Sequence, residues 1–273
     1  RRLTCSMSTK IILSINKTKV QTKKEGEFIT GFTVKTFDLE TEMKNLEYLF
    51  QNNLYSTNSW GNPKPKDHSA GYRGSSKAEN YIGMYGVTLD IDEPGLTIIQ
   101  AQEQFKDYKY ILHTSSGHQV DKPEKGGPID RYRIILPFEP RYNDEPWFVN
   151  SADAERFYAF LKWKYSYADR TVFERARKCF PFAGEDRSKY QFICHPDGKY
   201  ISFTLDEIKA GIVMSQKEEI RIRANESLER KKVEQEVFDS ARQLEQNIEN
   251  HQRKQINLTN GKPYYSPTGE EYV

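Results

Sequence analysis

The sequence predicts an α+β protein in which helices pack on a β-sheet and a charged helical segment follows. Three short apolar runs have the length and the β-branched composition of strands, and they lie at residues 86–92, 110–114 and 131–137. Apolar residues recur at helical spacing in residues 38–51, 96–105 and 151–168. In the last of these, Phe157, Phe160 and Leu161 form one apolar stripe, so this helix should pack on the sheet.

The flanking segments extend this architecture. Residues 10–15 and 27–36 alternate between apolar and polar side chains and are predicted to be strands. Thr204 and Glu207 match a capping box, which predicts the start of a helix. Residues 215–254 mix acidic and basic residues with sparse apolar ones, which predicts one long helix or two packed helices. The expected divisions are a main domain, a charged helical module or linker, and a tail, at residues 1–210, 211–256 and 257–273.

Composition limits the classes of function. A chain of 273 residues can hold one large domain and an appendage. The formal net charge of +2 gives no global basic signal, so a nucleic-acid surface would be a local patch. Three scattered cysteines argue against a disulfide scaffold and suit a reducing, cytoplasmic location. No apolar run approaches the roughly 20 residues of a membrane span, so no membrane partner is expected.

Two carboxylates mark the end of the first strand of the expected sheet. Asp90 and Asp92 alternate along it, so their side chains should point the same way, and Glu93-Pro94-Gly95 follows as a turn. Adjacent carboxylates repel each other unless a cation lies between them, and hard oxygen ligands suit Mg²⁺ or Mn²⁺. The alternative is a pair of carboxylates that only caps a turn.

Further motifs follow in a fixed order. Ser116 and His118 form a Ser-x-His motif after the second strand, and Asp169 stands at the end of the helix predicted at residues 151–168. The ordered set of Asp-x-Asp, Ser-x-His and Asp resembles the archaeo-eukaryotic primase superfamily, and within it the primase-polymerases of phages and plasmids. The resemblance covers roughly residues 60 to 200. It implies a primase-like fold whose core is an antiparallel or mixed sheet like that of an RNA-recognition motif.

The resemblance also implies roles for these residues. Asp90 and Asp92 would bridge two divalent ions, Mg²⁺ or Mn²⁺, and Asp169 would hold the ion nearest the attacking hydroxyl. Ser116 and His118 would grip the incoming triphosphate. The alternatives are an ordinary helix-end aspartate at 169, with Asp153 and Asp186 as substitutes, and a surface histidine at 118.

Basic residues supply candidates for phosphate contacts. Guanidinium groups match phosphate bidentately, so the expected nucleotide-binding residues are Arg131, Arg133, Arg177 and Lys178. Residues 52–77 mix basic and aromatic side chains, which suits single-stranded DNA through phosphate contacts and base stacking. The DNA-binding candidates there are Trp60, Lys64, Lys66, Tyr72 and Arg73. A solvated surface loop is the alternative for this segment.

The expected function is that of a template-directed DNA primase-polymerase, a nucleotidyltransferase of a phage or plasmid replication system. Its partners would be a single-stranded DNA template, a primer and deoxynucleoside or ribonucleoside triphosphates. A replicative helicase would be a separate chain, because no Walker A motif is present. One alternative is a replication-initiator nuclease resembling relaxases, although no His-x-His pair occurs. Another is a non-catalytic module that binds single-stranded nucleic acid.

The cysteines leave one further metal question open. Cys179, Cys194 and His195 could contribute to a zinc site, but no Cys-x-x-Cys pair is present. Small buried apolar residues are the favoured interpretation of the two cysteines.

Overall fold

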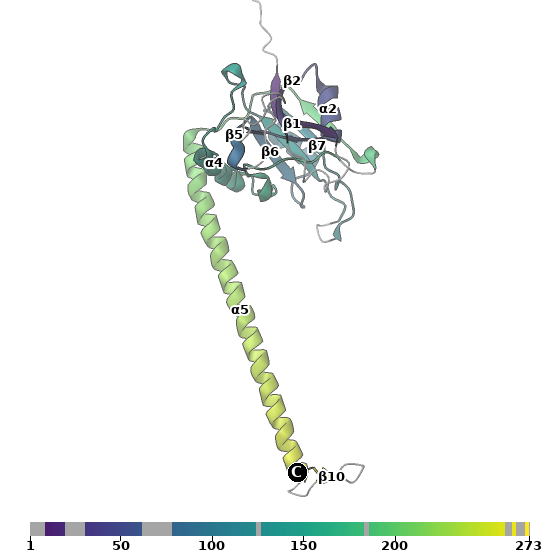
Figure 1. Ribbon diagram of the computed structural model, residues 1–273, viewed down its shortest axis with the longest axis vertical. Helices are drawn as coiled ribbons and strands as arrows, with labels where there is room; N and C mark the ends of the chain where they lie inside the picture. Colours follow the sequence, from purple (N-terminus) through teal and green to yellow (C-terminus); the bar gives the residue numbers. More distant parts are fainter. Residues whose placement is uncertain are drawn as a thin grey trace, which may run out of the picture. The chain divides into compact units, whose positions relative to one another are not determined.

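The computed structural model describes residues 9–19, 31–61, 78–123, 127–182, 186–259, 264–265 and 271–272, with side chains as far as residue 248. The protein is a mixed α+β structure with antiparallel sheets, as the sequence predicts (Figure 1). It divides into two compact units, Arg1–Gln216 and Lys217–Val273. None of the helices in the described ranges combines the length and apolar content needed to cross a bilayer.

The central sheet of the first unit has four antiparallel strands in the order β6-β8-β7-β9. These are β6 (Gly86–Ile91), β7 (Tyr110–Thr114), β8 (Tyr132–Pro137) and β9 (Phe192–His195). The strands that carry the Asp-x-Asp and Ser-x-His motifs are not neighbours, because β8 lies between them. Consecutive apolar residues such as Ile134 and Ile135 suit this central position, where both faces of the strand are buried.

Further strands and helices in the described ranges belong to the first unit. A second sheet has the order β2-β1-β3, with β1 (Lys10–Lys19), β2 (Thr33–Asp38) and β3 (Asn53–Ser56). A separate antiparallel pair consists of β4 (Asn58–Trp60) and β5 (Tyr81–Met84). The helices are α2 (Met43–Asn52), α3 (Ile98–Phe105) and α4 (Ser151–Lys164). The 3₁₀ turns are η1 (Ala78–Asn80), η3 (Tyr142–Asp144), η4 (Arg170–Val172) and η5 (Arg187–Lys189).

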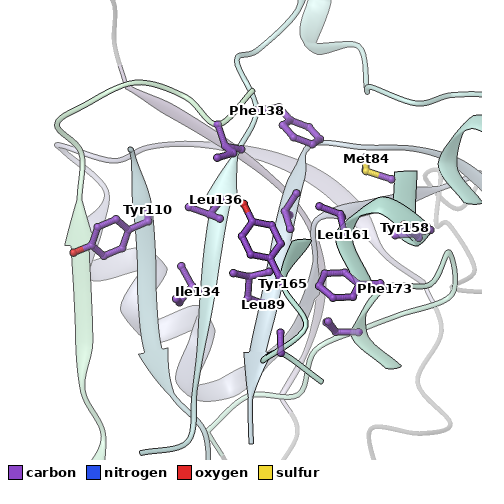
Figure 2. Close-up of a cluster of buried hydrophobic side chains, with 14 of the residues drawn as sticks. Met84, Leu89, Tyr110, Ile134, Leu136, Phe138, Tyr158, Leu161, Tyr165 and Phe173 are labelled. Atoms are coloured by element: carbon purple, nitrogen blue, oxygen red, sulfur yellow. The ribbon is translucent and has the colours of Figure 1, made fainter. Parts of the chain in front are cut away.

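Alternation along the central strands creates two hydrophobic clusters, one on each face of the sheet. Leu89, Ile134 and Leu136 point toward the cluster that includes Leu161 of α4 and Tyr165, as Figure 2 shows. Their neighbours along the strands, such as Ile135, pack instead with side chains of β1 and α2. The central sheet is therefore covered on both faces. Polar side chains of its strands are consequently at least partly buried whichever face they point to.

The predicted C-terminal helical segment is one helix, α5 (Leu205–Thr259). It begins at the predicted capping box, in which Glu207 N donates to Thr204 Oγ1 at 3.2 Å and Thr204 N donates to Glu207 Oε2 at 2.8 Å. Ile208 and Ile212 pack against the core of the first unit. From residue 217 to 248 every side chain is partly or fully exposed. Beyond it, β10 (Tyr264–Tyr265) and β11 (Glu271–Tyr272) pair in antiparallel fashion.

Candidate functional site

The motif residues of the first unit meet at one end of the central sheet. Because β8 runs antiparallel to both β6 and β7, the ends of β6 and β7 lie where β8 begins. Asp92 directly follows β6, and Arg131 directly precedes β8. His118 lies in the turn after β7, and its Nδ1 accepts a hydrogen bond from the backbone N–H of Arg131 at 3.3 Å. The Asp-x-Asp and Ser-x-His motifs are therefore connected through Arg131, although their strands do not touch.

Asp169 lies beside the first motif. Its backbone N–H donates to the carbonyl oxygen of Asp90 at 2.8 Å, across the outer edge of β6. Its carboxylate caps the turn η4, accepting from Thr171 N at 2.9 Å and from Thr171 Oγ1 at 2.8 Å. A turn that continues from the end of α4 thus carries the third aspartate to the strand that bears the first two.

A cleft of about 560 Å³ opens between these segments. It is lined by Asp92, Glu93, Pro94 and residues 166–170, which include Asp169 and Arg170. We call it the Asp92–Asp169 cleft. Two residues of the expected set, Asp92 and Asp169, therefore line the same space, and both are partly exposed.

Asp90 lies in a different environment from the other two aspartates. It is buried, and its Oδ2 lies 3.1 Å from Arg133 Nε and 3.9 Å from Arg177 Nη2. Asp90 and Arg133 are directly opposite each other on β6 and β8. Burial by itself would lower the pKa of Arg133, but the combined effects of Asp90, Tyr55 and Cys179 outweigh it, and the pKa is raised overall. The guanidinium stays charged and balances the Asp90 carboxylate.

The same face of the sheet holds a buried pair that the sequence did not reveal. The hydroxyl of Tyr55 lies 2.6 Å from His113 Nε2, and His113 Nδ1 lies 3.1 Å from Thr114 O. The ring of Phe50 stacks on His113 with centroids 4.7 Å apart. Burial, and then the charge of Arg133, lower the pKa of His113 to about 3. The imidazole is therefore neutral at pH 7, with Nδ1–H donating to the carbonyl and Nε2 accepting from the tyrosine.

Arg131 has a structural task in place of the expected contact with a nucleotide. It is fully buried, and its Nη1 donates to Gly117 O at 2.8 Å and to Val120 O at 3.0 Å. Its Nη2 donates to Gly127 O at 3.0 Å, and its Nε lies 3.4 Å from Asp92 Oδ1. Because carbonyl oxygens surround the guanidinium, it holds the turn after β7 and does not face solvent, which corrects the expectation of a phosphate contact.

The Ser-x-His motif has one exposed and one buried member. Ser116 is exposed, whereas His118 is only 3% exposed and lies 3.9 Å from Asp130 Oδ1 through its Nδ1. Burial lowers the pKa of His118, although the nearby Asp130 carboxylate opposes this. Because Nδ1 accepts a hydrogen bond, the proton of the neutral ring lies on Nε2. The alternative of a surface histidine in a polar loop is wrong.

The remaining basic and aromatic candidates are placed unequally. Arg177 and Lys178 are half-buried, and Arg177 lies beside Asp90. Trp60 is only 4% exposed, and its Nε1 donates to Arg175 O at 2.8 Å. It cannot stack on a nucleic-acid base in this arrangement, which corrects that expectation, because β4 turns it into the core. Lys64, Lys66, Tyr72 and Arg73 lie outside the described residues.

The two substitute aspartates are engaged in local contacts. Asp153 pairs with Arg156 one turn along α4, with Oδ1 and Nη1 3.4 Å apart. Asp186 caps η5 by accepting from Ser188 N at 3.0 Å. Neither residue lines the Asp92–Asp169 cleft. Asp169 also caps a turn, but it lines the cleft, so it stays the candidate for the third aspartate.

The donors of the cleft can be compared with what a divalent ion requires. Mg²⁺ and Mn²⁺ prefer carboxylate oxygens and retain several waters, so one or two carboxylates suffice for one ion. Asp92 and Asp169 meet this requirement because they line one cleft. In the described part of the chain no three His, Cys, Asp or Glu side chains gather around one point. The cleft thus contains two carboxylates of the type that suits such an ion, although Asp92 lies beside Arg131 and Asp169 caps η4, while Asp90 is engaged by arginines.

Cys179 and Cys194 behave as core residues. Cys179 is buried in the cluster beneath β7 and β8, and Cys194 packs against it. Burial raises the pKa of both thiols, that of Cys194 to about 11. This agrees with the favoured interpretation of small buried side chains.

Comparison with known proteins identifies no relative. No protein-family model, no curated protein and no solved structure matches the chain.

Proposed function

We propose that this chain is the catalytic part of a template-directed DNA primase-polymerase of a phage or plasmid replication system. One observation supports the proposal above all others. A continuous series of contacts joins Asp169 to Asp90 through their backbones, Asp92 to Arg131, and Arg131 to His118. Three motifs that are separated by up to about 80 residues in the sequence meet at one end of one sheet, beside an open cleft.

Each residue of this site has a task in nucleotidyl transfer. Asp92 and Asp169 would hold a divalent ion, and such ions, when bound, activate the attacking 3′-hydroxyl and stabilise the leaving pyrophosphate. Arg133 fixes the orientation of Asp90 at the base of the site. The exposed hydroxyl of Ser116 offers a donor to a phosphate oxygen, and His118, which is buried, holds the turn that carries Ser116 through its hydrogen bond with Arg131 N. Arg177 and Lys178 contribute positive charge near the triphosphate.

Primer synthesis and primer extension on single-stranded DNA, with Mg²⁺ or Mn²⁺, test the proposal. The wild type should incorporate nucleotides, and Asp92→Asn and Asp169→Asn should lose at least a hundredfold in rate while they retain the wild-type circular dichroism spectrum. Asp153→Asn is the matched control, because Asp153 is an exposed aspartate of α4 outside the cleft. A wild type that incorporates no nucleotide with either ion, or an active Asp169→Asn variant, contradicts the proposal.

The pairing of Asp90 with arginines favours a second candidate, a non-catalytic module that binds single-stranded nucleic acid. A carboxylate that is buried and balanced by Arg133 serves structure without an ion. The same assay separates the two candidates, because the module would bind DNA but incorporate nothing. No contact favours the initiator nuclease: His113 Nε2 is bonded to Tyr55, and His118 Nδ1 is bonded to the backbone.

A further inference from the structure

A second concave site lies at the opposite end of the central sheet. Lys109 directly precedes β7 and Phe138 directly follows β8, so both lie at the end far from Asp92. There, a cavity of about 440 Å³ has five aromatic side chains in its lining: Phe138, Trp147, Phe148, Tyr200 and Phe203. We call it the aromatic cavity. Its volume lies within the range of roughly 300–1,000 Å³ that is usual for small-molecule sites.

The aromatic walls are fixed in place before any ligand binds. Trp147 exchanges backbone hydrogen bonds with Met84 at 2.8 and 2.9 Å, and its indole Nε1 donates to Glu139 O at 2.9 Å. Phe148 stacks on Phe157 of α4, with centroids 4.1 Å apart and planes at 15°. Preformed walls lower the ordering cost that a ligand must overcome.

The backbone of this wall is strained. Phe148 has a φ of 53°, in the left-handed region that a bulky residue rarely occupies. Gly83 permits the close approach of the preceding segment, since a Cβ there would lie 2.5 Å from Pro146 Cβ. Strain of this kind persists where the surroundings enforce it, and it is concentrated at ligand-binding sites.

The rim of the cavity carries positive charge. Lys199 is exposed, and its Nζ lies 4.9 Å from the centroid of the Tyr108 ring. Within the described ranges no carboxylate lies within 4 Å of it. Lys109 Nζ is engaged, since it donates to Pro196 O at 2.6 Å. Among the described lining residues, Lys109 and Lys199 are the basic ones and Glu139 is the acidic one.

We propose that the aromatic cavity binds a nucleotide, with the base against the aromatic walls and the phosphate at Lys199. Flat aromatic walls favour a flat ring, and stacking of a base on an aromatic side chain requires no particular base. An exposed lysine at the rim favours a ligand whose flat ring carries an anionic group, because the ammonium attracts it. A free nucleoside monophosphate and one nucleotide of a single-stranded DNA both have this chemistry. The inference does not depend on the proposed polymerase activity, because the site lies at the other end of the sheet.

Tryptophan fluorescence of the full chain tests this inference. The chain has three tryptophans, of which Trp147 and Trp163 are each 39% exposed and Trp60 is buried. Titration with dAMP and, separately, with oligo(dT) should quench the wild-type emission. Trp147→Phe should remove the quenching but retain binding, since phenylalanine also stacks. Trp163→Phe, the matched control on α4, should retain the quenching.

The charge at the rim is tested separately. Lys199→Glu should weaken binding roughly tenfold, which corresponds to one lost charge-assisted contact, whereas Lys44→Glu, an exposed lysine of α2, should not. Quenching by dAMP alone identifies a free nucleotide as the ligand, and quenching by oligo(dT) alone identifies a DNA strand. The inference is overturned if neither probe quenches, if quenching survives in Trp147→Phe, or if Lys199→Glu binds as tightly as the wild type.

Discussion

The buried pair of Asp90 and Arg133 predicts that Asp90→Asn lowers the free energy of unfolding. Asp90→Asn keeps the size of the side chain and one oxygen that can accept from Arg133 Nε, but it removes the negative charge. The groups around Arg133 on that face, among them Tyr55, His113 and Cys179, are uncharged at pH 7 because burial disfavours their charged forms. The variant therefore leaves a buried guanidinium without a counterion.

The size of the effect follows from the burial of both partners. The side chains of Arg133 and Asp90 are 11% and 10% exposed, so solvent screens the pair only weakly. Removing one partner of a buried ion pair costs about 3–5 kcal/mol. Each kcal/mol shifts the melting temperature of a domain of this size by roughly 2–4 °C. Asp90→Asn should therefore lower the Tm by about 6–20 °C.

Thermal and urea unfolding at pH 7, with chelator present, measure the effect. Asp153→Asn is the control, because its partner Arg156 is 68% exposed, and its cost should stay below about 1 kcal/mol. The double variant Asp90→Asn/Arg133→Met should recover part of the lost stability, since it removes both charges. The reasoning is refuted if Asp90→Asn raises the Tm. A higher Tm would mean that Asp90 is repelled by neighbouring carboxylates when no ion is bound.

Three further predictions concern buried residues of the first unit. The pKa of His113 is about 3 in the folded protein and about 6.5 in the unfolded chain, so its contribution to the free energy of unfolding is complete above pH 6.5. This contribution falls by up to about 1.4 kcal/mol per pH unit as the pH decreases toward 3. In His113→Asn, the free energy of unfolding measured with urea should therefore depend less steeply on pH between about pH 4 and 7. Gly211→Ala should cost about 1–3 kcal/mol because its Cβ would collide with two aromatic rings of α4, whereas Gly95→Ala, with open space around it, should be nearly neutral in thermal unfolding. Arg131→Lys should lower the free energy of unfolding by about 2–3 kcal/mol and speed hydrogen exchange in the turn after β7, because lysine cannot reach three carbonyls at once. Equal effects in Arg156→Lys, at an exposed arginine, would contradict this prediction.

The elements of the fold could be predicted from local pattern. Residues 86–91 and 132–137 are strands because β-branched apolar residues recur there, and α4 follows from the spacing of Phe157, Phe160 and Leu161. The capping box at Thr204 marked the start of α5. Each of these signals depends on residues within a few positions of one another, so the sequence contains them directly.

The order of strands and the burial of polar residues could not be predicted in the same way. Alternation along a strand puts Arg131 and Arg133 on one face, but it does not show that β1, β3 and α2 cover that face. Tyr55 and His113 are 58 residues apart, and no local sequence pattern predicts their contact. Trp60 stands next to a segment rich in lysine, so composition favoured a surface position, whereas pairing of β4 with β5 turns it inward.

The hydrogen bond from Asp169 N to Asp90 O has a consequence for solubility. β6 is an edge strand of its sheet, and an uncovered edge exposes amide and carbonyl groups that can recruit a strand from another copy of the chain. The turn after α4 covers part of this edge with the same residues that bear the third carboxylate. Shortening or rerouting that turn would therefore promote aggregation as well as alter the cleft.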